Sequence, residues 1–215
     1  MISTKRLVRE LKRNDFRVAV FGSARIKKGN PIYDQVFHLS EMIGKRGMDI
    51  VTGGGPGLME AASAGHKAGS KKIKSHSIGL GIKLPHEQRF NGSVEVKEEF
   101  KLFTNRLDKF MLLSNAIVIA PGGVGTLLEF FYSWQLMQVE QTCHIPIILM
   151  GSMYKDLIKW LKKGPLNKKY FKKEDMNTIF AARTPEEAMK IIDASCKEFK
   201  KGSKNFCVNY KKYRI

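Results

Sequence analysis

Residues 117–129 read Ile-Val-Ile-Ala-Pro-Gly-Gly-Val-Gly-Thr-Leu-Leu-Glu, and this stretch decides the fold. An apolar run stops at Pro121, three glycines follow within four residues, and an amphipathic segment then begins. This order predicts a buried parallel strand, a tight turn and the start of a helix. Gly122, Gly123 and Gly125 let backbone N–H groups approach a ligand, and a helix N-terminus attracts negative charge. We therefore expect this turn to bind phosphate.

Other readings of the turn are weaker. An ordinary strand-to-helix loop needs one glycine rather than three. The spacing fits neither a Walker loop nor a GxGxxG fingerprint, and no lysine follows the glycines.

A second junction of the same kind lies upstream. A predicted strand at 48–51 runs into residues 52–62, Thr-Gly-Gly-Gly-Pro-Gly-Leu-Met-Glu-Ala-Ala. The first predicted strand, 17–21, likewise ends at Gly22-Ser23, and such residues often mark the ligand edge of an open parallel sheet. Glycines also permit close packing of a helix on a strand, so part of the second cluster has a structural interpretation as well.

The remaining pattern predicts one α/β domain over residues 1–215, with an open parallel sheet flanked by helices. Further strands are expected at 77–82, 145–150 and 177–181, and helices at 4–14, 32–46, 100–113, 127–139, 154–161 and from Thr184 to about residue 200. We find no internal repeat and no linker. A basic tail spans about 201–215.

Composition limits the classes of function. The 215 residues hold no apolar run near the ~20 that a membrane helix needs. The N-terminal residues are charged, without the apolar core of a signal peptide. Cys143, Cys196 and Cys207 are odd in number and lack CxxC spacing, so neither disulfides nor zinc are indicated. We expect a cytoplasmic protein without a metal or cofactor.

The formal net charge of +18 is large for this length. Lysines gather between residues 155 and 173 and from 197 onward, away from the glycine motifs, and no helix-turn-helix, zinc-finger or RNA-recognition signature accompanies them. We interpret them as solvated surface and do not expect nucleic acid as a partner. Nucleic-acid binding through this surface is an alternative, which salt-dependent retention on DNA or RNA would test.

Two helices carry further hypotheses. In the predicted helix 100–113, Arg106 lies beside the apolar stripe of Phe103, Leu107 and Phe110, so it needs an acid or a bound anion unless it extends to solvent. Residues 130–137 are predicted to form an aromatic-rich helix that is apolar almost all round, which indicates either deep burial or a subunit contact. Together, this helix and the stripe predict a homodimer or larger homo-oligomer.

The motifs taken together resemble the LONELY GUY family, often labelled "possible lysine decarboxylase". The similar stretches are Phe21-Gly22-Ser23-Ala24-Arg25, the GGGPGxMEAA run at 53–62, the LPxEQxxN loop at 84–91, and PGGxGTxxE at 121–129. They span about residues 17–151.

The resemblance implies a modified Rossmann fold and a phosphoribohydrolase, which cleaves the N-glycosidic bond of nucleoside 5′-monophosphates to free base and ribose 5-phosphate. It implies that Glu129 and Arg106 are catalytic. Phosphate would be held by Gly54, Gly55 and Gly57 together with Gly122, Gly123, Gly125 and Thr126, and Ser23 and Glu87 would contact substrate. The chain departs from the family pattern at Leu107, usually Lys, and at Gly92-Ser93.

Chemistry agrees with this activity. Cleavage passes through an oxocarbenium-like sugar, which a carboxylate stabilises while it orients or deprotonates water. Arg106 would neutralise phosphate or stabilise the departing base. No lysine setting suits a pyridoxal Schiff base, so decarboxylation is not expected. The alternative function is a non-catalytic nucleotide or molybdenum-cofactor carrier, which needs the glycine loops but not the Arg106–Glu129 pair.

Overall fold

The computed structural model of the chain describes residues 13–71, 73–83 and 89–202. Its centre is one seven-stranded sheet in which all neighbouring strands are parallel. The strands are β1 (Arg17–Phe21), β2 (Asp49–Thr52), β3 (Ser77–Ile82), β4 (Val96–Phe100), β5 (Ala116–Ile119), β6 (Ile147–Met150) and β7 (Ile179–Ala182). The predicted α/β fold with an open parallel sheet is confirmed.

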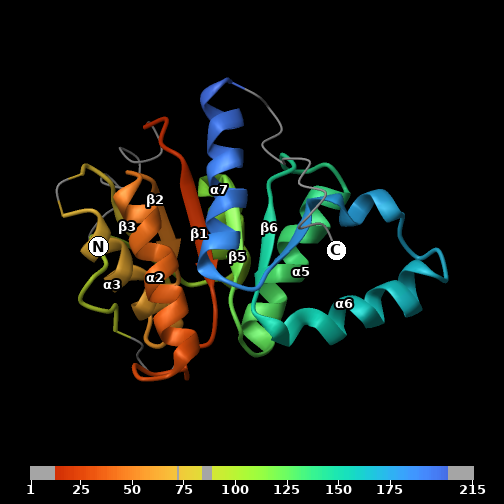
Figure 1. The fold of residues 1–215 in the computed structure, drawn as a ribbon, viewed down its shortest axis with the longest axis horizontal. Helices are drawn as coiled ribbons and strands as arrows, with labels where there is room; N and C mark the ends of the chain where they lie inside the picture. Colours follow the sequence, from red (N-terminus) through yellow and green to blue (C-terminus); the bar gives the residue numbers. More distant parts are fainter. Residues whose placement is uncertain (1–12, 72, 84–88, 203–215) are drawn as a thin grey trace.

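Helices cover both faces of this sheet (Figure 1). They are α2 (Pro31–Lys45), α3 (Leu58–Gly69), α4 (Phe103–Leu113), α5 (Val124–Gln138), α6 (Lys155–Leu161) and α7 (Pro185–Lys200). Three short helical segments join them, at Ser152–Tyr154, Lys162–Leu166 and Lys173–Thr178. Helices α2, α3 and α7 pack on one face, and α4, α5 and α6 pack on the other.

The strand order is β4-β3-β2-β1-β5-β6-β7. The chain therefore builds outward from β1 to one edge of the sheet, returns to the other side of β1, and builds outward again. Ligands of open parallel sheets bind where this reversal occurs, beyond the carboxyl ends of the two central strands. In this protein that place lies between β1 and β5.

The central strands are buried on both faces, as their continuous apolar sequences require. Val18 and Val20 of β1 face the core under α2, α3 and α7, whereas Ala19 and Phe21 face the core under α4 and α5. All five residues of β1 are buried. The sheet is thus a rigid base for the loops at its carboxyl edge.

Two boundaries differ from the sequence prediction by three residues, and the others differ by at most two. Phe100 ends strand β4 and does not begin a helix, and α4 starts at Phe103. The sequence of β4, Val-Lys-Glu-Glu-Phe, is charged because β4 is an edge strand that is only partly covered, so it lacks the apolar run of an inner strand. Helix α5 begins at Val124, three residues earlier than predicted, and so includes Gly125 in its first turn.

The predicted leading helix at 4–14 and the basic tail at 201–215 lie almost wholly outside the described residues, as does Glu87. Among the residues that are described, no helix has both the length and the apolar character to cross a membrane.

The apolar side chains from which an oligomer was predicted are largely internal. Leu107 and Phe110 of α4, and Phe130, Trp134 and Met137 of α5, are buried in the core of the single chain. These five side chains are therefore buried within the chain itself, and the predicted subunit contact through the two helices stays a prediction that would depend on their other residues. Phe103 alone of the named stripe is exposed, and other apolar residues of the same helices, such as Leu112 and Leu128, join it at the surface.

Close packing of α2 on α3 depends on glycine. A Cβ at Gly65 would lie 2.1 Å from the carbonyl oxygen of Phe37. We expect Gly65→Ala to destabilise the fold by about 1–3 kcal/mol, because the overlap with backbone outweighs the gain of up to about 1 kcal/mol in helix propensity. Thermal unfolding measures this effect. Gly125→Ala is the control, since a Cβ there meets nothing within 4 Å; equal melting temperatures for the two variants would contradict the prediction.

Candidate active site

Three loops meet at the carboxyl edge of the sheet, where β2, β1 and β5 end side by side. The backbone joins them directly. The Ser23 N–H donates to the Pro121 carbonyl over 3.0 Å, and the Leu58 N–H donates to the Ser23 carbonyl over 2.9 Å. The loop after β1 thus links the two glycine motifs, which lie far apart in the sequence.

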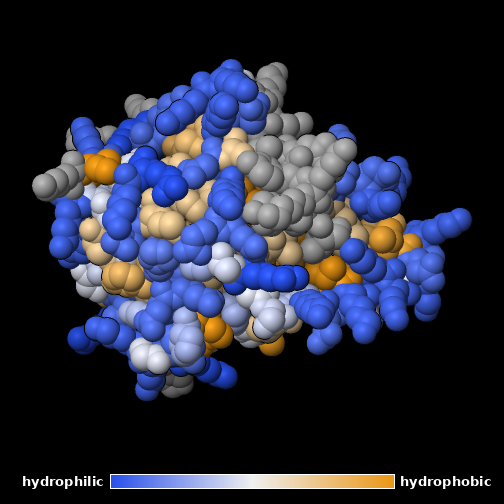
Figure 2. All heavy atoms as spheres, in the orientation of Figure 1, coloured by the Kyte–Doolittle hydropathy of each residue, from blue (hydrophilic) through white to orange (hydrophobic). Residues whose placement is uncertain are grey.

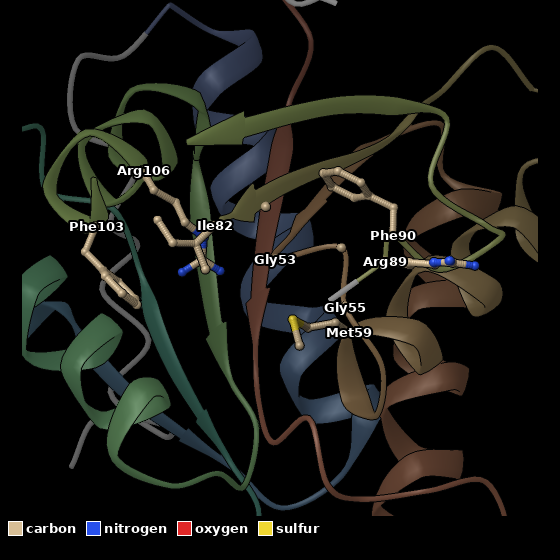
Figure 3. Close-up of a pocket in the computed structure, with 10 residues that line it drawn as sticks. Gly53, Gly55, Met59, Ile82, Arg89, Phe90, Phe103 and Arg106 are labelled. Atoms are coloured by element: carbon tan, nitrogen blue, oxygen red, sulfur yellow. The ribbon is translucent and has the colours of Figure 1, made fainter. Parts of the chain in front are cut away.

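A cavity of about 490 Å³ opens between these loops. Its lining contains most of the residues that the sequence predicted for the site, namely Ser23, Arg106, Gly123, Gly125, Thr126 and Glu129. A smaller cavity of about 160 Å³, drawn in Figure 3, shares Gly53, Met59 and Arg106 with the first and also contains Gly54 and Gly55. Arg106 therefore lies between two connected spaces.

The first turn of α5 presents free backbone donors to the larger cavity. Gly123 is the N-cap residue, and no side chain caps the helix. Gly123 and Gly125 are exposed, and a Cβ on either would meet nothing within 4 Å. A helix N-terminus with uncapped N–H groups and open space before it is suited to an anion. Gly122 differs, because a Cβ there would lie 2.2 Å from the Thr126 hydroxyl, so its small size allows Thr126 to pack.

The glycines of the second cluster, at 53–57, contribute more to packing within the protein than the glycines at the start of α5 do. Gly57 has a positive φ of 69°, its Cβ would lie 2.5 Å from the Ser23 carbonyl oxygen, and it lines neither cavity. Gly54 has a φ of 73° and packs under Phe90, while its N–H donates to the Thr52 hydroxyl over 3.0 Å. The Asn91 side-chain amide then donates to the carbonyls of Gly54 and Gly55. This loop is held in a fixed shape at the cavity wall.

Arg106 and Glu129 form a largely buried ion pair at the cavity, with 3.3 Å between Nη1 and Oε1. The guanidinium is held from three sides. Its Nε donates to the Leu80 carbonyl over 2.7 Å, its Cζ lies 5.1 Å from the centre of the Phe110 ring, and Gly53 leaves room for Nη2. Arg106 is thus paired with an acid, which is one of the partners that the sequence analysis expected for a cation beside an apolar stripe.

Burial dominates the ionisation of this pair. It raises the pKa of the Glu129 carboxyl to about 7, although the charge and hydrogen bond of Arg106 oppose the rise. Burial likewise lowers the pKa of Arg106, against the stabilising charge of Glu129. A carboxyl with a pKa near neutrality exchanges a proton readily at physiological pH, as catalytic acids and bases do.

Some lining residues were not predicted from the sequence. Arg25 and Met59 border the larger cavity, and Arg89 and Phe90 border the smaller one. Arg25 and Met59 stand within the quoted motifs, whereas no local pattern marks Phe90 as a lining residue. Figure 3 shows Phe90 across the smaller cavity from Arg106 and Phe103. Leu107, where the family pattern has Lys, is buried in the core and lines neither cavity.

The described residues contain no group of three or more His, Cys, Asp or Glu that could hold a metal ion. Among the described residues that line the larger cavity, the polar groups are one carboxyl, guanidinium groups, hydroxyls and backbone N–H donors. This set is suited to binding a phosphorylated sugar and to proton transfer.

Known proteins agree with this description. The model of a family described as "Possible lysine decarboxylase" matches residues 59–192, and the chain belongs to this family. The resemblance found in the sequence is confirmed. A pyrimidine/purine nucleotide 5′-monophosphate nucleosidase of Escherichia coli K12 is 27% identical over 140 residues, which are 62% of this chain and 30% of that protein. The chain thus aligns with under a third of that relative's length.

Two solved structures share the fold. The molybdenum cofactor binding protein of Rippkaea orientalis has a TM-score of 0.62 and 21% identity, over 83% of this chain and 96% of that one. The molybdenum cofactor carrier protein of Chlamydomonas reinhardtii has a TM-score of 0.61 and 19% identity, over 87% and 99%. At identities this low, the likeness establishes a common fold only. The identity of the ligand has to be inferred from the residues of the site.

Proposed function

We propose that the protein is a nucleoside 5′-monophosphate phosphoribohydrolase. It would hydrolyse the N-glycosidic bond of substrates such as AMP or cytokinin riboside monophosphates and release the free base and ribose 5-phosphate. The observation that carries this proposal is the Arg106–Glu129 pair at the wall of a cavity whose other wall is the open N-terminus of α5. The name of the Escherichia coli relative supports the same chemistry.

The geometry supports one order of the substrate groups along α5. A 5′-phosphate at the first turn of α5 would accept hydrogen bonds from the free N–H groups near Gly123 and Gly125. Glu129 lies five residues after the helix start, which is about 7.5 Å along the axis. That separation is close to the span of a ribose, so the carboxyl would lie beside the sugar while the phosphate is held.

Glu129 and Arg106 would then divide the work. As the glycosidic bond breaks, positive charge develops on the sugar, and an ionised Glu129 stabilises it and directs a water molecule to the anomeric carbon. Arg106, between the two cavities, would contact the departing base or the phosphate. The smaller cavity, with Phe90 and Phe103 on its walls, is the space left for the base.

The direct experiment is to incubate the purified chain with AMP and assay adenine and ribose 5-phosphate. Release of both in equal amounts is the expected result. Tight AMP binding without release would overturn the proposal and favour the non-catalytic carrier. Decarboxylation of lysine is not expected, because none of the described residues that line the two cavities is a lysine that could hold pyridoxal.

The pH dependence of the reaction follows from Glu129. Because the pKa of its carboxyl is raised to about 7, the group is mostly protonated below that pH and ionised above it. If the carboxylate form is required, kcat/KM rises with pH up to about 7 and then levels off. Initial rates with AMP between pH 5 and 9 measure this. A kcat/KM that falls as the pH passes 7 would assign the protonated carboxyl the role of a general acid.

We also propose that the active protein is a homodimer or larger homo-oligomer, as the sequence suggested, with Phe103 of the predicted stripe and two further apolar side chains at the contact. Phe103, Leu112 and Leu128 of α4 and α5 are exposed apolar residues, and Phe103 also lines the smaller cavity. Light scattering at micromolar concentration should give at least twice the mass of one chain, and Leu112→Glu should reduce it. A monomeric wild-type protein would contradict this proposal. A cytoplasmic location stays a prediction.

A further inference from the structure

The segment from Lys155 to Lys173 is a second distinctive surface, at the end of the molecule that carries α6. It contains eight lysines and one acid, Asp156, in nineteen residues. All eight lysines are exposed. Within the described part of the chain, no ion pair joins any of them to a carboxylate. Figure 2 shows hydrophilic side chains projecting along this end, around hydrophobic residues.

Part of this segment lines an open groove of about 440 Å³, which we call the aromatic groove. Lys159, Lys169 and Lys172 are chain neighbours of its lining residues Trp160, Tyr170 and Phe171. Its walls come from α5, from α6 and from the chain that follows α6, and its rings and ring-like side chains are Phe131, Trp134, Trp160, Pro165, Tyr170 and Phe171. The aromatic groove shares helix α5 with the candidate active site but has no lining residue in common with it. It is therefore a separate site.

The floor of the aromatic groove is fixed, whereas its rim is open. Trp134 is buried, its Nε1 donates to the Asp175 carbonyl over 2.7 Å, and Phe171 meets its ring edge-on at 5.2 Å. Trp160 and Tyr170 are instead 60% and 75% exposed. No ring contact joins either of them to another described aromatic residue. Two large free ring faces thus stand beside unpaired cations.

We propose that the aromatic groove binds single-stranded nucleic acid. Bases would stack on Trp160 and Tyr170 while phosphates contact the surrounding lysines, which is how single strands bind without sequence-specific hydrogen bonds. This proposal reverses our interpretation of the lysines as solvated surface, because several of them adjoin, along the chain, the exposed aromatic residues that line the groove. It goes beyond the proposed hydrolysis and does not depend on it.

Charge and shape favour single-stranded nucleic acid in the aromatic groove over a second copy of the chain or an anionic membrane. A second copy of the chain would bring another eight lysines against the first eight, and like charges would repel. An anionic membrane fits a projecting apolar surface better than a concave groove with a buried floor. The Asp175 carboxylate, whose residue also accepts the Trp134 hydrogen bond through its backbone carbonyl, accepts hydrogen bonds from the Gln138 amide and the Lys172 N–H, which offset its charge.

The test is a titration of the purified full chain against fluorescein-labelled dT12, rU12 and a DNA hairpin duplex, followed by anisotropy at several KCl concentrations. Vesicles of phosphatidylserine serve as the membrane competitor. The variants are Trp160→Ala, Trp160→Phe, and Lys168→Gln with Lys169→Gln. The matched control is Lys67→Gln with Lys71→Gln, which makes the same charge change at exposed positions on the far side of the molecule (Figure 1).

We expect a single strand to bind more tightly than the duplex, with dT12 and rU12 showing whether the sugar matters. Trp160→Ala should weaken binding by about 5- to 150-fold, and Trp160→Phe should restore most of it because a ring face remains. The Lys168/Lys169 pair should reduce the slope of log K against log[KCl] by about 1.4, at roughly 0.7 per phosphate contact, and the control pair should leave it unchanged.

Three results would overturn the proposal. The first is equal affinity for the single strand and the duplex, and the second is an affinity that Trp160→Ala does not change. The third is an equal loss of affinity from the two double lysine variants, which would show only attraction to the net charge of +18. Displacement of the strand by vesicles at low lipid concentration would assign the surface to membranes instead. Melting temperatures accompany each variant, and base release from AMP should be unchanged in all of them.

Discussion

Glu129→Gln should lower the turnover of AMP by roughly two to four orders of magnitude, while the fold and nucleotide binding survive. The substitution keeps the size of the side chain and an oxygen that accepts the hydrogen bond from Arg106 Nη1. It removes the negative charge that would stabilise the oxocarbenium-like sugar and the base that would accept a proton from water. AMP affinity should change little, because the first turn of α5 and Arg106 remain.

The thermal stability of Glu129→Gln distinguishes a catalytic role of the carboxylate from a purely structural role. The folded-state pKa of Glu129 is raised from 4.5 to about 7, so its ionised form is disfavoured by folding. Its contribution to the free energy of unfolding is fully present below pH 4.5 and is lost as the pH rises through about 7. At pH 8 the wild-type protein carries this cost, and the neutral Gln does not. Glu129→Gln should therefore melt at the same temperature or higher at pH 8.

The decisive measurement combines melting temperature, AMP affinity and turnover on one preparation of the variant. Glu174→Gln is the matched control, since Glu174 is exposed and lines neither cavity. If Glu129→Gln retained turnover within a few-fold of wild type, Glu129 would have no part in the chemistry. If it also melted well below wild type, the carboxylate would be a structural group only.

Much of the architecture could be predicted because it depends on local patterns. Continuous apolar runs such as 116–120 fill inner strands, and glycine after such a run marks the carboxyl edge of the sheet. Strand β4 was missed because an edge strand tolerates charge, and Val96 is its one fully buried residue. For Phe130 and Trp134 the sequence left burial in the chain and a subunit contact as alternatives, because an all-round apolar helix does not reveal what covers it; the structure buries both side chains.

The site could be predicted in part for a similar reason. Residues that follow strands, such as Gly123 and Ser23, come together because parallel strands end at one edge. Phe90 could not be found in this way, since the fold of a long loop brings it over Gly54. The roles of Gly54 and Gly57 likewise depend on contacts with Phe90 and Ser23, which no spacing within the cluster reveals. The motif glycines thus fall into two groups: some leave space for a ligand in the cavity, and others leave space for neighbouring side chains or backbone of the protein.

That division leads to the second large effect, which is that cleavage should require the 5′-phosphate. AMP should be cleaved with a kcat/KM at least about a thousandfold above that of adenosine. Several backbone N–H groups at the start of α5 would hold a dianion in a partly closed cavity, and such charge-assisted bonds together are worth several kcal/mol of transition-state binding. The ratio comes from initial rates of base release with each substrate.

Gly125→Ala tests the same phosphate site at the first turn of α5 by changing the protein instead of the substrate. A Cβ at Gly125 meets nothing within 4 Å in the protein, so the fold should be retained and helix propensity should even improve. The methyl group would instead occupy space next to the bound phosphate. We expect kcat/KM for AMP to fall at least tenfold, while the slow rate on adenosine stays the same. Gly92→Ala is the control, since Gly92 is exposed, lines neither cavity, and a Cβ there also meets nothing within 4 Å. Equal rates on AMP and adenosine, or a Gly125→Ala variant with full activity on AMP, would remove the phosphate from the first turn of α5.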